Sequence, residues 1–548
     1  MLAAKALAVA AVPPVRTGWP LPWDDVAVAA GLAAVVGFLP RALRVAIVLV
    51  VVAATTLSLL LVRTVGVPLL PSLLRGFDPA MGDSVAAYLT MGSAAAAGLI
   101  GAAAVFGGWL GRRWSLPPAA LAAIAATAGG IALIAEAPDL AHRNAVAAFA
   151  RAVLPRAVPT PAGAPIGERR VAGGPLLPSG AAAGRNVVFV VLESAAQRFV
   201  AANDSPSAMP FLRTLAAQGL DCTDASATYP ESIEGQVAVF CGLPPMPDAS
   251  PRDYARHAAQ ALPHRLRPHG YRSALFHSGR FDFLGMRDVI GPMGFDVLAD
   301  AATLGGERST SFGIDEETTV DALLRWLGEL PPAQRAFACW LPIAGHHPYS
   351  SPPGGPFPTD TQLGCYRNAL HYADRMLARL WAGMCALAPS EQWLLVVVGD
   401  HGQAFGEQPG NFGHAFAVYD ENLRVPFVVC APGAIAPGLV HDAPCSHLDV
   451  APTLLDLLGV GGEGALRADP GAERCVHAFT DWGDLQVAAR TQRWQLVHDL
   501  ASGRDQLLDR SGAGGGGHDV AAAQPDVVVR LRAEAVRWLA AARAGPQP

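Results

Sequence analysis

The sequence predicts a multi-span α-helical membrane domain followed by an α/β domain with a mostly parallel central sheet. Three observations support this fold class. Residues 1–150 consist largely of Ala, Val, Leu and Gly with few charges, whereas residues 186–548 have an ordinary globular composition. In the second part, short apolar runs alternate with longer amphipathic stretches, which is typical of a parallel sheet covered by helices on both faces. A stretch rich in Pro, Gly and Ala separates the two parts.

With 548 residues, the chain is too long for one ordinary domain. We therefore divide it into a transmembrane domain (1–138), a juxtamembrane helix and linker (139–185) and an α/β domain (186–545). Residues 139–154 have the pattern of an amphipathic helix lying on a membrane surface. The remainder of the middle segment has no apolar period, so we expect it to be a linker.

The membrane domain is predicted from four apolar segments that reach or approach the ~20 residues needed to span a bilayer. A buried core helix is the alternative for any one of them, but four such segments in succession disfavour it. The segments cover residues 24–40, 43–62, 85–110 and 119–136.

The short loops between these segments predict the orientation. Arg41 and Arg44 lie between the first two segments, and Arg112 and Arg113 lie between the last two, with no acidic residue in either loop. Because Lys and Arg favour the cytoplasmic side, both loops are expected inside and the α/β domain outside. A fifth span over residues 2–12 would leave this orientation unchanged. We expect a multi-pass protein of the cell (inner) membrane with a periplasmic, extracytoplasmic α/β domain.

The α/β domain is predicted from its alternating elements. Strands are expected at Asn186–Leu192, Ser273–Phe276, Phe337–Leu341, Trp393–Val398 and Pro426–Cys430. Helices are expected near residues 208–219, 255–268, 315–329, 364–387 and 448–458. Ligands of such sheets bind beyond the carboxyl ends of the strands, so polar residues at those ends are the candidates for a functional site. The formal net charge of −6 gives no indication of nucleic-acid binding.

Two strand ends carry metal-ligating residue types. Glu193 follows the first predicted strand, and Asp400 and His401 follow the fourth. If both strands are central, two carboxylates and an imidazole meet at one edge, which suits a divalent ion such as zinc or manganese. The alternative is that the acidic side chains only cap loops.

A nucleophile is predicted at a helix start. Pro230 precedes the expected helix and Gly242 ends it, which places Ser232 at its N-terminus. The helix dipole and free amide groups there favour an alkoxide and an anionic ester. Most serines at such positions are only N-caps, which is the alternative for Ser232. Thr228 is the second candidate for the nucleophile.

Residues 186–542 resemble the alkaline phosphatase superfamily, most closely its lipoteichoic-acid synthase, phosphoglycerol transferase and sulfatase branch. The resemblance rests on four motifs: Val398-Gly-Asp400-His401-Gly-Gln-Ala-Phe-Gly-Glu407 with Gly413-His414, Tyr419-Asp-Glu-Asn-Leu-Arg424-Val-Pro426, Ser446-His-Leu-Asp449-Val-Ala-Pro452, and Ala489-Arg490-Thr-Gln-Arg-Trp494 to Asp509. The last of these is similar to a C-terminal β-hairpin of sulfatases.

This resemblance implies roles for individual residues. It implies a divalent metal bound by Glu193, Asp400, His401 and the nucleophile Ser232. It implies that His346 or His414 protonates the leaving group or positions the ester. Substrate contacts are implied for His277 and Arg287, and at least one of His346 and His347 is expected to touch the substrate, although ordering of their loop is the alternative.

The chain departs from the sulfatase pattern at the nucleophile. The Cys/Ser-x-Pro-x-Arg signature, which is converted to formylglycine, is absent, and the chain has Ser232-Ile-Glu-Gly-Gln instead. This counts against sulfatase chemistry and for a plain hydroxyl nucleophile. The resemblance then implies transfer of phosphoglycerol or phosphoethanolamine from a membrane phospholipid to an envelope glycan or lipid, through a covalent serine intermediate. A sulfatase or phosphodiesterase of the same fold is the alternative. A lipid-sensing pseudoenzyme is disfavoured, because all four metal-site candidates are present.

Overall fold

The computed structural model describes residues 174–200, 206–310, 312–461, 466–468, 474–511 and 517–545, with isolated positions between residues 28 and 70. Apart from those positions, the four predicted spans and the amphipathic helix at 139–154 lie outside the described residues. No helix among the described residues is long and apolar enough to cross a bilayer.

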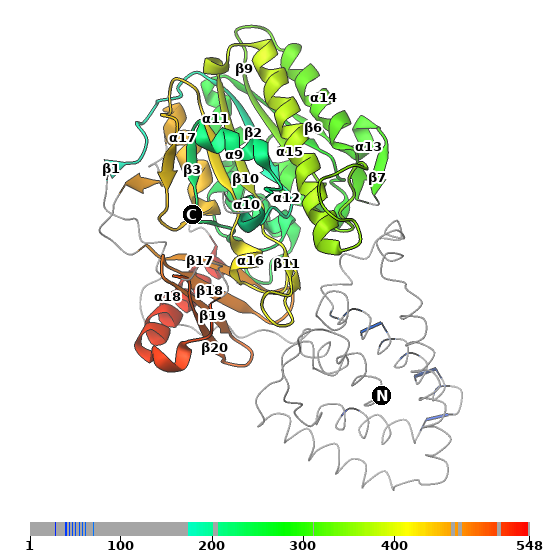
Figure 1. Cartoon of the computed structure of the whole chain (residues 1–548), viewed down its shortest axis with the longest axis vertical. Helices are drawn as coiled ribbons and strands as arrows, with labels where there is room; N and C mark the ends of the chain where they lie inside the picture. Colours follow the sequence, from blue (N-terminus) through cyan, green and yellow to red (C-terminus); the bar gives the residue numbers. More distant parts are fainter. Residues whose placement is uncertain are drawn as a thin grey trace.

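An eight-stranded sheet forms the centre of the described domain, in the order β14-β3-β13-β10-β2-β9-β5-β6 (Figure 1). Strand β13 runs antiparallel to its two neighbours, and the other pairs are parallel, which confirms the mostly parallel sheet. The strands are β2 (Asn186–Leu192), β3 (Leu220–Cys222), β5 (Tyr271–His277), β6 (Val297–Ala299), β9 (Arg335–Leu341), β10 (Trp393–Gly399), β13 (Phe427–Cys430) and β14 (Leu439–His441).

Helices cover both faces of this sheet because its central strands are apolar on both sides. In β2, Phe189 packs into one hydrophobic cluster and its neighbours Val188 and Val190 pack into another. The first cluster contains residues of α10 (Ser232–Cys241) and α17 (Val450–Leu458). The second contains residues of α9 (Pro210–Ala217), α14 (Glu316–Gly328) and α15 (Gln362–Leu387). Continuous apolar strands are typical of such doubly covered sheets.

The predicted strands agree with the observed ones within two residues at each end. The prediction of one continuous helix near residues 255–268 is wrong. The chain forms a 3-10 helix at Pro251–Gln260 and then α11 (Leu262–Leu266), with Ala261 extended between them. Pro263 explains the break, because a proline has no amide hydrogen to donate and its ring clashes with the preceding turn of a continuous helix.

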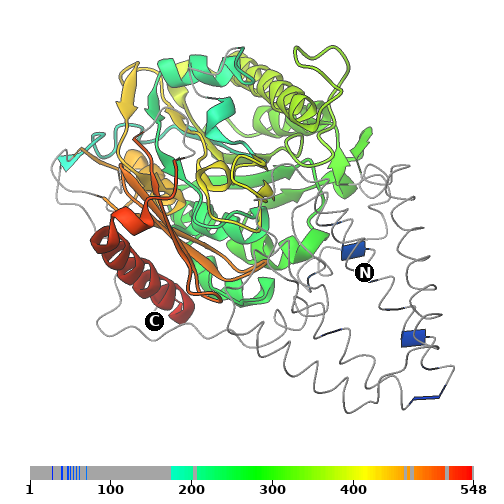
Figure 2. The same cartoon turned by 60° about the horizontal axis from the view of Figure 1, so that its bottom comes forward.

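The C-terminal region is larger than the predicted hairpin. Four antiparallel strands, β17 (Val476–Thr480), β18 (Gln486–Arg490), β19 (Trp494–Asp499) and β20 (Asp505–Asp509), form a second sheet. Helix α18 (Pro525–Ala544) packs on this sheet and shares a separate hydrophobic cluster with it (Figure 2). The helix supplies the cover that a small sheet needs to bury one face.

The described end of the predicted linker packs onto the domain. Leu177 and Ala182 are buried in the first hydrophobic cluster, and the amide of Ala182 donates to the carbonyl of Leu457 at 2.8 Å. The folded domain therefore begins before Asn186.

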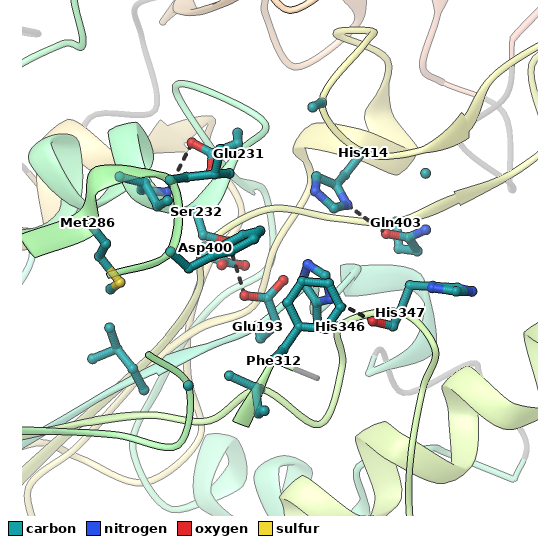
Figure 3. A pocket seen from close by; sticks show the side chains of 18 of the residues that line it. Glu193, Glu231, Ser232, Met286, Phe312, His346, His347, Asp400, Gln403 and His414 are labelled. Atoms are coloured by element: carbon teal, nitrogen blue, oxygen red, sulfur yellow. Dashed lines mark hydrogen bonds between the residues drawn. The ribbon is translucent and has the colours of Figure 1, made fainter. Parts of the chain in front are cut away.

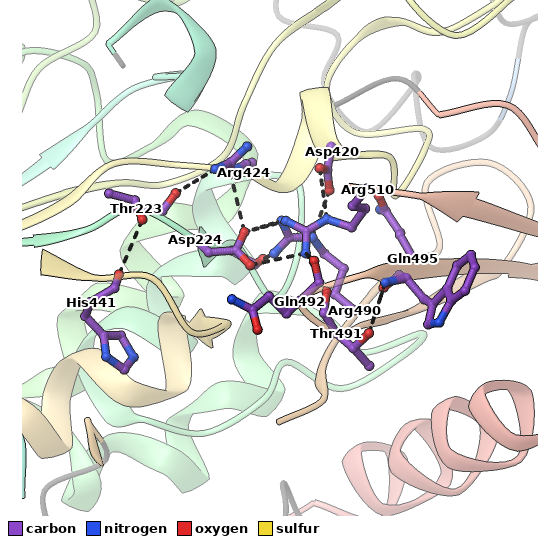
Figure 4. A network of polar contacts seen from close by, with 12 residues as sticks. Thr223, Asp224, Asp420, Arg424, His441, Arg490, Thr491, Gln492, Gln495 and Arg510 are labelled. Carbon is purple, nitrogen blue, oxygen red and sulfur yellow. Dashed lines mark hydrogen bonds and ion pairs between the residues drawn. The ribbon is translucent and has the colours of Figure 1, made fainter. Parts of the chain in front are cut away.

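A buried ion-pair network joins the C-terminal sheet to the central domain (Figure 4). Arg490, at the end of β18, is 1% exposed and donates to Asp224 and to Asp420, each at 2.8 Å. Arg510, just after β20, also pairs with Asp224 and lies 3.3 Å from Asp420. Burial raises the pKa of both carboxyls, but Arg490 and Arg510 lower it by more, so that both pKa values end below the ordinary value.

These lowered pKa values predict a loss of stability in acid. A carboxylate whose pKa is lowered on folding stabilises the protein above its unfolded pKa, and this contribution is lost as the pH falls toward the folded pKa. We expect the melting temperature of the domain to fall by roughly 5 °C between pH 5 and pH 3. The Asp224→Asn variant should have a lower melting temperature at neutral pH and a flatter acid dependence. Asp288→Asn, at an exposed pair with Arg252, should keep the acid dependence of the wild type.

Candidate active site

Three candidate metal ligands meet at the carboxyl edge of the central sheet. Strands β2 and β10 are parallel neighbours, and Leu192 is in register with Gly399. The residues that follow these strands are Glu193, Asp400 and His401, and one ligand atom from each lies within 4.8 Å of the others. Adjacent parallel strands thus bring together residues that are 207 positions apart or more.

The imidazole of His401 is oriented for metal binding. Its Nδ1 lies 2.9 Å from the carbonyl oxygen of Gly402, so this nitrogen is the protonated one and donates to the carbonyl. The lone pair is then on Nε2, which lies 3.6 Å from the nearest carboxylate oxygen of both Glu193 and Asp400. A histidine whose second nitrogen donates to a backbone carbonyl is the usual form of a protein metal ligand.

The two carboxyl groups need a positive charge. Burial, followed by the nearby Asp400, raises the pKa of Glu193, and burial raises the pKa of Asp400 to about 7. Two acidic groups held together in a buried position are costly unless a cation neutralises them. The donor set of two carboxylates and one imidazole therefore fits a divalent metal ion.

Ser194 donates a hydrogen bond to each of the two carboxylates. It was not identified as a site residue from the sequence. Its hydroxyl donates to Glu193 Oε1 at 2.7 Å, and its amide donates to Asp400 Oδ1 at 2.8 Å. Its backbone is left-handed, with φ of 55°. Residues other than glycine adopt this conformation at a cost, and they do so mainly where the surrounding structure fixes them. Tyr366 contributes to this by donating its hydroxyl to the Ser194 carbonyl at 2.5 Å.

Ser232 is the first residue of α10 and does not cap it. The cap is Glu231, whose carboxylate accepts from the amides of Ile233 and Glu234. The Ser232 hydroxyl instead donates to Glu193 Oε2 at 3.0 Å and lies 3.1 Å from His401 Nε2. Its position at the start of a ten-residue helix exposes it to the positive end of the helix dipole.

A pocket with a volume of about 380 Å³ opens over these residues (Figure 3). Its wall contains seven of the residues singled out from the sequence: Glu193, Ser232, His277, His346, His347, Asp400 and His414. His401 is fully buried and is not part of the wall. Thr228, the second candidate nucleophile, is 0% exposed and is also absent from the wall.

His414 stacks on the ring of His401, with ring centroids 4.1 Å apart. Its Nδ1 lies 3.1 Å from Gln403 Oε1, and the Gln403 amide donates to the hydroxyl of Tyr349 at 2.8 Å. Burial, together with the neighbouring His401 and His346, lowers the pKa of His414 well below its ordinary value. A neutral His414 can position an ester or accept a proton, but it is a poor proton donor. His346 is therefore the better candidate for the acid.

His346 and His277 reach the pocket from two other strand ends. The His346 ring lies 4.0 Å from the ring of Phe312, measured between centroids, and its Nδ1 lies 2.7 Å from the carbonyl of His347. His277 is the last residue of β5, and its Nδ1 lies 3.1 Å from the carbonyl of Leu341.

Of the two nearby arginines, only Arg280 lies in the pocket wall. Arg287, the residue implied by the resemblance, is outside the wall. Its side chain is 52% exposed, donates to Asp282 at 2.9 Å and lies 3.8 Å from Asp300.

The fold and site together define an enzyme with a candidate metal cluster and a serine at the carboxyl edge of a mostly parallel sheet. The chain belongs to the sulfatase family, whose model matches residues 185–460, just over half of the sequence.

Named relatives include a synthase and a transferase. The chain is 25% identical to lipoteichoic acid synthase 2 from Bacillus subtilis over 51% of this chain and 46% of the relative. It is 24% identical to phosphoglycerol transferase I from Xanthomonas euvesicatoria over 55% of this chain and 45% of the relative. The chain thus spans less than half the length of either relative.

A solved structure shares the fold. The crystal structure of the lipoteichoic acid synthase LtaP from Listeria monocytogenes matches with a TM-score of 0.55 and 21% identity, covering 67% of this chain and 93% of that chain.

Proposed function

We propose that the protein is a membrane-bound, metal-dependent phosphotransferase. It moves a phosphoglycerol or phosphoethanolamine head group from a membrane phospholipid to an envelope glycan or lipid, on the extracytoplasmic side of the cell membrane. The observation that carries this proposal is the Ser232 hydroxyl, which lies between Glu193 and His401 at a helix N-terminus. Similarity to proteins named as a lipoteichoic acid synthase and a phosphoglycerol transferase supports it.

The reaction begins at the serine. A divalent ion held by Glu193, Asp400 and His401, with manganese or zinc as the best matches, would neutralise developing charge and lower the pKa of the serine hydroxyl. Glu193 Oε2 accepts the proton of Ser232 along the 3.0 Å hydrogen bond. The Ser232 oxygen attacks the phosphorus, and the bond from phosphorus to the lipid oxygen breaks. The positive end of the α10 dipole favours the anionic group, because Ser232 is the first residue of the helix.

Histidines assist the departure of the lipid, and the acceptor then regenerates the free serine. His346 protonates the departing lipid oxygen, while His414, His277 and His347 position the ester. His346, now deprotonated, accepts the proton of an acceptor hydroxyl as its oxygen attacks the phosphorus. The bond to Ser232 breaks, and Glu193 returns the proton to the serine oxygen along their hydrogen bond. The same geometry serves both halves, because the acceptor oxygen enters where the lipid oxygen left.

The pocket wall supports a lipid donor. It includes the apolar side chains of Phe283, Met286 and Phe416, together with Leu61. Leu61 belongs to the apolar segment 43–62, the strongest predicted span. A wall with one residue from that segment suits a donor that is confined to the membrane surface, where its effective concentration is high.

The experiment is transfer by the full chain in detergent. Labelled phosphatidylglycerol and phosphatidylethanolamine are incubated with and without divalent metal, and the label is followed into an acceptor. We expect metal-dependent transfer of one head group. We expect Asp400→Ala to lose activity and the ion held by Glu193, Asp400 and His401. Asp321→Ala, which removes a half-exposed carboxylate paired with Arg379, is the matched control. Equal transfer by metal-free and metal-loaded protein would contradict the proposal.

Hydrolysis is the second candidate, favoured by the match of the chain to the sulfatase family. In this case water replaces the acceptor hydroxyl in the second half of the reaction. Release of free phosphoglycerol, phosphoethanolamine or sulfate at the same rate with and without acceptor would favour the hydrolase.

Arg280 is proposed as the cation that binds the phosphoryl group, because it lies in the pocket wall and Arg287 does not. A hydrogen bond from a guanidinium to a phosphate contributes about 1.5–3 kcal/mol. We therefore expect Arg280→Ala to raise KM for the phospholipid roughly 10- to 100-fold. Arg287→Ala should change KM less than about threefold, as for a surface ion pair. The reverse order of effects would instead assign the contact to Arg287.

A further inference from the structure

A second cluster of metal-ligating side chains lies in the C-terminal subdomain and shares no residue with the active site. Cys475 directly precedes β17, His477 is its second residue, and Glu534 lies in α18. One ligand atom from each lies within 4.8 Å of the others. Residues two apart along an extended chain point to the same side, so Cys475 and His477 both face the helix that carries Glu534.

The distance between the first two ligand atoms suits a tetrahedral metal. Cys475 Sγ lies 3.6 Å from His477 Nε2. A sulfur and a nitrogen bound to one tetrahedral zinc lie about 3.5 Å apart, given zinc bonds of about 2.3 and 2.0 Å. The geometry therefore needs little adjustment to hold an ion between these two atoms.

His477 presents Nε2 to the cluster from a buried position. It is 4% exposed, and its Nδ1 is buried without a hydrogen-bond partner among the described residues. Its ring stacks on Trp538 of α18 at an interplanar angle of 16°, which fixes its orientation. The nitrogen that faces Cys475 is Nε2, and this is the atom that would bind the ion.

We propose that Cys475, His477 and Glu534 bind a zinc ion that fastens β17 to α18. A thiolate, an imidazole and a carboxylate form a donor set that zinc accepts, with water in the fourth position. The thiolate and the carboxylate balance the two charges of the ion, and the thiol proton is released on binding. Arg530 lies 4.0 Å from Glu534. A solvent-accessible ion pair of this kind is weak, so it competes little with zinc for the Glu534 carboxylate.

Cobalt substitution of the full-length, detergent-purified chain tests this site. A thiolate bound to Co²⁺ gives a sulfur-to-metal charge-transfer band in the near ultraviolet. The cluster of Glu193, Asp400 and His401 contains no cysteine, so the band reports on the second site alone. We expect the wild type to show the band and to bind two zinc ions per chain. Asp400→Ala should keep the band and bind one zinc ion.

Variants of the second site should lose the charge-transfer band and keep the ion at the active site, which is the reverse of Asp400→Ala. Cys475→Ala should abolish the band and lower the zinc content by one ion per chain, while the ion held at Asp400 remains. Glu534 is a partly exposed residue of α18, so the Glu534→Gln variant is expected to fold normally. The variant should weaken zinc binding at least tenfold. Cys365→Ala, at a thiol of α15 that is not fully buried, is the matched control and should keep both the band and the zinc.

The structural role has its own readout. In the Asp400→Ala background, removal of zinc by a chelator should lower the melting temperature, and it should have no effect once Cys475→Ala is added. A wild-type spectrum without the charge-transfer band, or a zinc content that Cys475→Ala and Glu534→Gln both leave unchanged, would overturn the proposal. Neither outcome depends on whether the enzyme is a transferase or a hydrolase.

Discussion

Replacement of Ser232 by alanine is expected to reduce turnover by on the order of 10⁴-fold or more and to prevent formation of a covalent phosphoenzyme. The reason is geometric: the hydroxyl donates to Glu193 Oε2 and touches His401 Nε2, and Glu231 rather than Ser232 caps α10. The substitution therefore removes the nucleophile and leaves the helix start intact. Acid quenching during turnover of a phosphorus-labelled lipid, followed by mass spectrometry of the peptide that contains residue 232, measures both effects.

Thr228→Ala is the matched control for this experiment. Thr228 lies only four residues earlier, but its side chain is fully buried and does not line the pocket. The control should turn over at nearly the wild-type rate and should still label Ser232. Labelling of Thr228, or full activity of Ser232→Ala, would show that the nucleophile has been assigned to the wrong residue. Retention of stoichiometric metal by Ser232→Ala would exclude loss of the metal site as the cause of inactivity.

The sequence was sufficient to predict the central strands and the residues that follow them. Strands β2, β9 and β10 are continuous apolar runs, and such runs identify buried parallel strands without knowledge of their partners. Strands β3, β6 and β14 are three residues long, and so short a segment has no recognisable period. These strands exist because a neighbouring strand offers them hydrogen bonds, which is a property of the assembled sheet.

Within the site, the residues that could not be predicted depend on local backbone geometry. Ser194 supports both carboxylates because its φ is positive, and its residue type gives no indication of this. Between Arg280 and Arg287 the chain passes through Leu284 and Gly285, both with left-handed φ. That turn determines which of the two arginines reaches the pocket. The cluster at Cys475 and Glu534 was not predicted, because its members come together only through the packing of α18 on the C-terminal sheet.

Replacement of Arg490 by methionine is expected to destabilise the domain by about 3–5 kcal/mol. The guanidinium is 1% exposed and donates to Asp224 and Asp420. Methionine fills a similar volume, so the main effect is to leave two buried carboxylates with fewer partners. Arg510 remains beside both and keeps the loss from being larger. The free energy of unfolding in urea, or the melting temperature if unfolding is irreversible, measures the effect.

Arg493→Met is the matched control, because Arg493 is 62% exposed and pairs with Asp509 at 3.4 Å on the surface of the same sheet. Its effect should stay within about 0.5 kcal/mol. The pH dependence separates lost charge pairing from lost packing. If the cost of Arg490→Met comes from unpaired carboxylates, the difference from wild type is greatest near pH 7 and narrows below about pH 5. Protonation removes the uncompensated charge in the variant. In the wild type, the stabilisation that the ion pairs give relative to the unfolded chain also declines as the pH falls through the unfolded pKa. A difference that is the same at both pH values would mean that Arg490 stabilises the junction by packing, and that the carboxylates of Asp224 and Asp420 do not depend on it.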